Sequence, residues 1–84
     1  MSTLGIVCAD SEDLRGLALL AGEAGHNASA AQGIEEAVEI LREHRPKLML
    51  VCDAPGHDAE IMVREILRVS PLIPIVVALK VRDA

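Results

Sequence analysis

The chain has 84 residues, of which 51% are hydrophobic and none is Phe, Tyr or Trp, and its formal net charge is −5. This length allows one small domain with an aliphatic core, while the acidic balance and the lack of base-stacking side chains argue against nucleic-acid binding. No apolar stretch approaches the ~20 residues that span a bilayer, and no basic lead precedes the first apolar run, so we expect a cytoplasmic protein without membrane contact.

The first third of the chain predicts a strand, a helix and a weaker strand. Residues 4–9 form a nearly continuous apolar run, which is typical of a strand covered on both faces. Asp10 is placed to cap a helix with apolar residues at helical spacing, and Gly25 is placed to end it. Residues 26–30 are polar and small, which favours a strand at the edge of a sheet.

The rest of the chain continues the alternation of helix and strand. We predict a helix over 34–44, ended by Pro46, then an apolar strand over 48–52. A second amphipathic helix over 59–69 leads to a fourth strand over 75–79.

This βαβαβαβ order predicts an α/β domain with a parallel sheet between helical layers. Right-handed crossovers most simply give the flavodoxin-like strand order 2-1-3-4. Functional groups should then gather at the carboxyl ends of the first and third strands. Those ends carry Cys8, Asp10, Cys52 and Asp53, followed by a loop to Asp58, which is placed to cap the next helix.

Several segments resemble the CheY-like receiver domains of bacterial response regulators. These segments are the strand and acid at 5–10, Glu23-Ala24-Gly25-His26, the helix leading to Pro46, the strand and Pro-Gly loop at 47–58, and 71–77. The resemblance implies a regulatory domain of a two-component signalling protein, truncated after the fourth strand. Residues 1–84 would form one receiver-like domain without the usual last helix-strand-helix portion, with an output domain of the same protein beyond it.

The chemistry of that family implies paired acids that hold Mg²⁺ and an aspartate that accepts phosphate, and this chain departs from both. Cys8 and Ala9 fall on the acidic positions and leave only Asp10. An ungapped match puts Cys52 at the phosphoacceptor position, with Asp53 one residue later. We therefore predict an atypical receiver that acts through protein contact. The alternative is a working receiver in which Asp53 takes phosphate from a histidine kinase and Mg²⁺ is held weakly by Asp10 and Asp53.

The two cysteines leave further interpretations open. Cys8 and Cys52 are too few and too distant in sequence for a secreted disulfide framework, and small buried apolar side chains are the simplest reading. Adjacent strands lie about 4.8 Å apart, within reach of a disulfide, so a thiol redox switch is an alternative. A zinc site with His57 and Asp10 lacks the short ligand spacing typical of such sites.

The fourth strand predicts a contact surface. Because it lacks a neighbour on one side, it offers a template for pairing, and we expect self-association through Ile75, Val76, Val77 and Leu79. The sequence has no Gly-rich phosphate loop and no nucleophile elbow, so we expect no enzymatic activity and no cofactor other than Mg²⁺.

Overall fold

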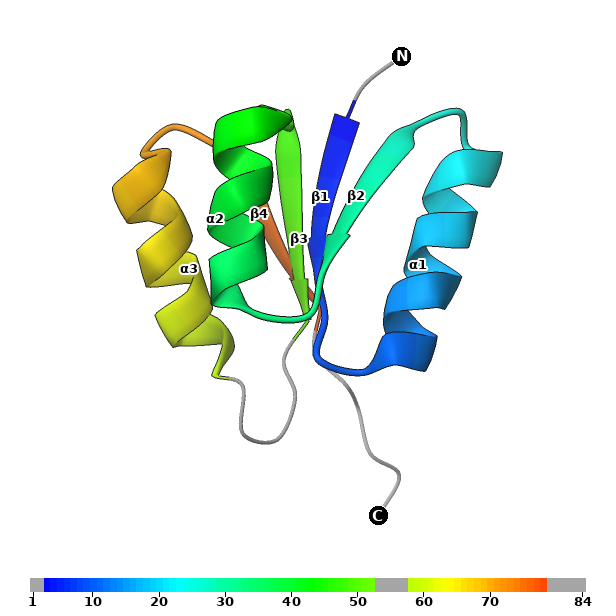
Figure 1. Cartoon of the computed structure of the whole chain (residues 1–84), viewed down its shortest axis with the longest axis horizontal. Coiled ribbons are helices and arrows are strands. Elements are labelled where there is room, and N and C mark those ends of the chain that lie inside the picture. The colour runs from blue at the N-terminus through cyan, green and yellow to red at the C-terminus, as the bar shows by residue number, and fades with distance from the viewer. Residues whose placement is uncertain (1–2, 53–57, 79–84) are drawn as a thin grey trace.

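A computed structural model describes residues 3–52 and 58–78 of the chain (Figure 1). Within these residues the elements alternate as the sequence predicts. They are β1 (Thr3–Val7), α1 (Ser11–Glu23), β2 (Asn27–Ala31), α2 (Ile34–Glu43), β3 (Leu48–Cys52), α3 (Ala59–Val69) and β4 (Ile75–Ala78). No helix in this part of the chain is long and apolar enough to cross a membrane.

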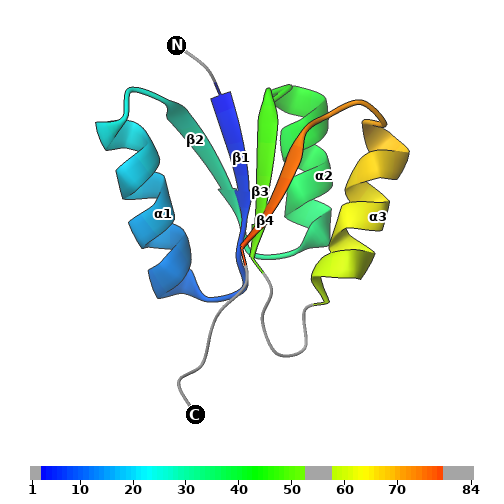
Figure 2. The same ribbon diagram turned by 180° about the vertical axis from the view of Figure 1, so that it is seen from behind.

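The four strands form one parallel sheet in the order β2-β1-β3-β4, which confirms the predicted flavodoxin-like topology. Helix α1 lies on one face of the sheet, and α2 and α3 lie side by side on the other (Figures 1 and 2). Strands β2 and β4 are the two edges of the described sheet. The carboxyl ends of all four strands therefore meet at one end of the domain.

The core consists of two aliphatic layers, one on each face of the sheet. The layer under α2 and α3 is the larger and contains Val7, Ala31, Ala37, Ile40, Leu41, Met49, Val51, Ala59, Met62 and Ile66. The layer under α1 contains Ile6, Cys8, Leu14 and Cys52. Within the first layer the end of the Met49 side chain lies directly against Gly5 on the neighbouring strand, so a Cβ at this position would require the Met49 side chain to shift.

Capping residues set the helix boundaries close to the predicted ones. The side chains of Asp10 and Asp58 accept hydrogen bonds from the first turns of α1 and α3. Gly25 has a φ of 86°, a left-handed conformation that ends the segment after α1. Arg45 has a φ of 45° after α2, although a non-glycine residue there is strained. The sequence predicts that Pro46 ends this helical segment, but it does not predict the left-handed backbone at Arg45.

Several sequence predictions fall outside the described residues. They concern Asp53, His57, Leu79 and the polar tail at 80–84. Their proposed roles stay predictions.

Candidate functional site

The carboxyl ends of β1 and β3 lie next to each other in the middle of the sheet. The parallel register pairs Val7 with Val51, so the following residues, Cys8 and Cys52, are neighbours across the two strands. Both side chains belong to the layer under α1. The structure thus brings together the two cysteines that the sequence placed at this end.

The thiols of Cys8 and Cys52 are almost fully enclosed. Their residues are 2% and 9% exposed. The backbone N–H of Cys8 donates to the Ala31 carbonyl over 2.9 Å, which ties the end of β1 to β2. Cys8 and Cys52 both carry free thiols. The position that the receiver resemblance assigns to acidic side chains is therefore filled by a buried sulfur.

Burial and neighbouring charge keep the Cys52 thiol protonated. Burial raises its pKa from the ordinary value of 9.0 to about 12, with further contributions from a hydrogen bond with the Cys8 side chain, the charge of Cys8 and the charge of Asp13. A thiol in this state is a weak nucleophile and a weak metal ligand at neutral pH. The Cys52 thiol is therefore poorly reactive in the folded, reduced domain.

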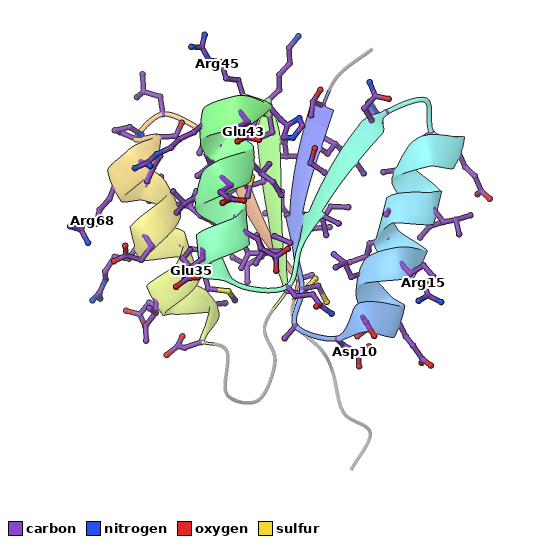
Figure 3. The ribbon with its side chains drawn as sticks, in the orientation of Figure 1. Asp10, Arg15, Glu35, Glu43, Arg45 and Arg68 are labelled. Carbon is purple, nitrogen blue, oxygen red and sulfur yellow. The ribbon has the colours of Figure 1, made fainter. Side chains whose placement is uncertain are left out.

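Asp10 lies at the same end of the sheet, but its carboxylate is engaged by the helix that follows it (Figure 3). Its Oδ1 atom accepts hydrogen bonds from the backbone N–H groups of Glu12 at 2.9 Å and Asp13 at 3.2 Å. These bonds satisfy donors that the first turn of α1 leaves without partners. Asp10 is thus a helix cap, as the sequence predicts.

Other acids near this end also occupy the first turns of helices. Glu12 and Asp13 lie in the first turn of α1, Glu35 and Glu36 in that of α2, and Glu60 in that of α3. Negative charge at these positions is stabilised by the helix dipole. Among residues 3–52 and 58–78, no group of three or more His, Cys, Asp or Glu side chains is arranged to hold a metal ion.

The open edge of β4 is the second feature that the sequence singled out. Val76 and Val77 are 49% and 42% exposed, whereas Ile75 is half-buried against the core under α2 and α3. The N–H of Met49 donates to the Pro74 carbonyl. Because parallel pairing alternates along a strand, the N–H and carbonyl of Val77 point away from β3, toward the open edge.

A hollow of about 480 Å³ lies at the opposite end of the domain, between the last turns of α2 and α3. Its lining includes Leu41, Arg42, Arg45, Pro46, Val69 and Ser70. Figure 3 shows Arg45 at this end, far from Asp10. Sequence reasoning did not identify it, because its lining residues come from the ends of two helices and the residues that follow them, which are separate in the chain.

Comparison with solved structures identifies the fold. The chain is similar to a response regulator receiver domain from Clostridium thermocellum, with 16% identity, a TM-score of 0.83, and coverage of 94% of this chain and 65% of that one. A CheY-like receiver domain from Methanospirillum hungatei is 13% identical, with a TM-score of 0.84 and coverage of 99% and 67%. The anti-anti-sigma factor PhyR from Bartonella quintana is 20% identical, with a TM-score of 0.78 and coverage of 90% and 32%.

These similarities confirm the predicted receiver-like fold. No protein-family model matches the sequence, and no curated protein matches it either. The chain spans about a third of PhyR and about two thirds of the single receiver domains. The architecture therefore is that of a CheY-like receiver through its fourth strand.

Proposed function

We propose that this chain is the amino-terminal part of a regulatory receiver domain in a bacterial two-component signalling protein, and that it acts in the cytoplasm through protein contact rather than catalysis. Its principal contact is self-association along β4, which would communicate with an output domain of the same protein. The observation that carries this proposal is the apolar open edge of β4 in a receiver fold, with Val76 and Val77 exposed.

The reduced role of phosphoryl chemistry rests on the residues at the carboxyl end of β1. A receiver that transfers phosphate needs Mg²⁺, which prefers carboxylate and water oxygens. Cys8 is buried where the resemblance implies an acid, and the Asp10 carboxylate is hydrogen-bonded to the first turn of α1. Both features disfavour a stable Mg²⁺ site.

Association through β4 is tested by placing a charge on its edge. Edge lysines oppose strand pairing because they must be desolvated when a second strand approaches. We expect Val77→Lys to reduce the weight-average mass in multi-angle light scattering to that of a monomer at concentrations where the unsubstituted chain associates. Circular dichroism would establish that the variant keeps its fold.

Leu72→Lys is the matched control, because Leu72 is 96% exposed in the turn before β4 and the substitution adds the same charge. It should associate like the unsubstituted chain. A strict monomer for the unsubstituted chain, or equal loss in both variants, would contradict association through this edge.

The competing hypothesis is a working phosphorelay receiver in which Asp53 accepts phosphate from a histidine kinase. An amide NMR titration with Mg²⁺ and beryllofluoride, which mimics the phosphoryl group, distinguishes the two. We expect no saturable chemical-shift changes in the folded chain. Saturable changes centred on Asp10 and Asp53 would instead establish a working pocket and overturn the atypical-receiver proposal.

A further inference from the structure

The two buried thiols at the carboxyl ends of β1 and β3 have a geometry that the proposed function does not use. Cys8 and Cys52 directly follow Val7 and Val51, the last residues paired between β1 and β3, and their side chains enter the same core layer. Neighbouring strands are about 4.8 Å apart, and disulfides accept Cα separations of about 4.4–6.8 Å. The fold therefore satisfies two conditions for a disulfide, separation and common side-chain direction.

In the part of the chain that the structure describes, the core layer around the pair is apolar. The described neighbours in their layer are aliphatic: Ile6, Leu14, Leu17, Ala18, Ala28, Leu50 and Ala78. The side chains of Cys8 and Cys52 also pack together in this buried layer. Replacing this contact by a covalent bond would remove two hydrogen atoms from an apolar layer and leave no new polar group without a partner.

We propose that Cys8 and Cys52 are a modification site at which a small-molecule disulfide installs a reversible intramolecular disulfide between β1 and β3. In the first step one cysteine sulfur, as its thiolate, attacks the small disulfide; a mixed disulfide forms and one small thiol leaves. The second cysteine then attacks the mixed disulfide and releases the second small thiol. The two protein thiols lose two electrons and two protons in total, which convert the small disulfide into two thiols.

Access governs how fast this exchange proceeds. Cys8 and Cys52 are 2% and 9% exposed, so a small disulfide reaches them during folding or local opening rather than in the closed domain. The equilibrium between dithiol and disulfide does not depend on access, because it is set by how the folded backbone places the two cysteines next to each other. The proposal thus predicts slow oxidation of the native domain but extensive oxidation during refolding. It does not depend on self-association through β4.

The test is to refold the complete 84-residue chain in a buffer of reduced and oxidised glutathione, quench with an alkylating agent, and determine the intact mass. We expect the main product to lack two hydrogen atoms, to resist alkylation and to return to the dithiol with a reductant. The equilibrium constant for forming the intramolecular disulfide from the dithiol and oxidised glutathione should be on the order of 100-fold greater in native buffer than in concentrated urea. The thermal midpoint of the oxidised chain should exceed that of the reduced chain by on the order of 10 °C.

Cys8→Ser and Cys52→Ser are the matched variants, and each should give only a free thiol or a glutathione adduct. The comparison between native buffer and urea needs no substitution, so the test still decides if a variant fails to fold. Equal intramolecular oxidation in native buffer and urea would overturn the proposal. So would a refolded chain that stays reduced, carries only glutathione adducts, or has a lower thermal midpoint when oxidised.

Discussion

Cys52 shows how one buried side chain can make the stability of the domain depend on pH. Its pKa is raised from 9.0 to about 12, chiefly by burial and then by the hydrogen bond with Cys8. In the unfolded chain the same thiol loses its proton near its ordinary pKa. Between these two values the folded state binds more protons than the unfolded state, and the free energy of unfolding therefore falls as pH rises.

We predict that this contribution is fully present below about pH 9 and is lost between about pH 9 and 12, with a slope of at most about 1.4 kcal/mol per pH unit. Urea unfolding under reducing conditions, followed by far-UV circular dichroism at several alkaline pH values, measures it. Tyrosine titration does not interfere, since the chain has none.

Two substitutions test the assignment of this slope to Cys52. Cys52→Ala should flatten the decline, although it lowers stability at every pH by removing packed volume. Cys8→Ala removes the hydrogen bond and the neighbouring charge but leaves burial, the largest cause, so it should retain part of the slope. An unchanged decline in Cys52→Ala would assign the effect to another group.

The sequence predicted where the cysteines lie along the chain but not how they meet. Period-two patterns place residues on strands, and the strand order follows from short right-handed crossovers. Whether the two side chains enter one core layer depends on the register between β1 and β3, which pairs Val7 with Val51. Register comes from contacts between distant segments, and a shift of one residue would have turned one thiol to the opposite face.

At the scale of elements, the boundaries that the sequence predicted well are those with a local chemical signal. Helix α3 runs from Ala59 to Val69 behind its Asp58 cap, and β3 runs from Leu48 to Cys52, both as predicted. Weakly patterned ends shifted slightly, and β2 occupies Asn27–Ala31 rather than 26–30. The left-handed backbone of Arg45 was not predictable from the sequence. This conformation after a helix is usually adopted by glycine, and an arginine gives no signal for it.

The cap of α1 yields a prediction that separates a structural role for Asp10 from a role in Mg²⁺ binding. Its Oδ1 atom accepts hydrogen bonds from two backbone N–H groups, so we expect Asp10→Ala to lower the free energy of unfolding by about 1 kcal/mol. Asp10→Ser, which keeps a capping oxygen, should restore most of this loss. Urea unfolding with and without millimolar MgCl₂ measures both effects.

Asp58→Ala is the internal comparison, because Asp58 caps α3 through the N–H of Glu60 in the same way. If Asp10 acts as a cap, the two alanine variants lose similar stability and neither loss changes with Mg²⁺. A loss at Asp10 that grows when Mg²⁺ is added would instead show that the cation stabilises the folded domain through this carboxylate.

At the scale of the whole molecule, the sheet formed by the described residues has two edges of different character. The β2 edge carries Asn27 and Ser29, whereas β4 carries Val76 and Val77 with substantial exposure. Pairing of β4 with β2 of another copy would leave open edges and continue into a filament. Pairing of β4 with β4 is self-complementary and ends at a dimer, which leaves the polar edges outside.

We therefore predict that the folded state is stabilised by mass action and that association stops at two chains. The thermal midpoint of the unsubstituted domain should rise with protein concentration, because a dimer that forms only between folded chains shifts the unfolding equilibrium. Calorimetry over a wide concentration range measures the midpoint, and light scattering measures the limiting mass.

In Val77→Lys the midpoint should no longer depend on concentration, while Leu72→Lys should behave like the unsubstituted chain. A mass that keeps growing with concentration would instead indicate β4-to-β2 pairing, since only a head-to-tail contact leaves an edge free for the next copy.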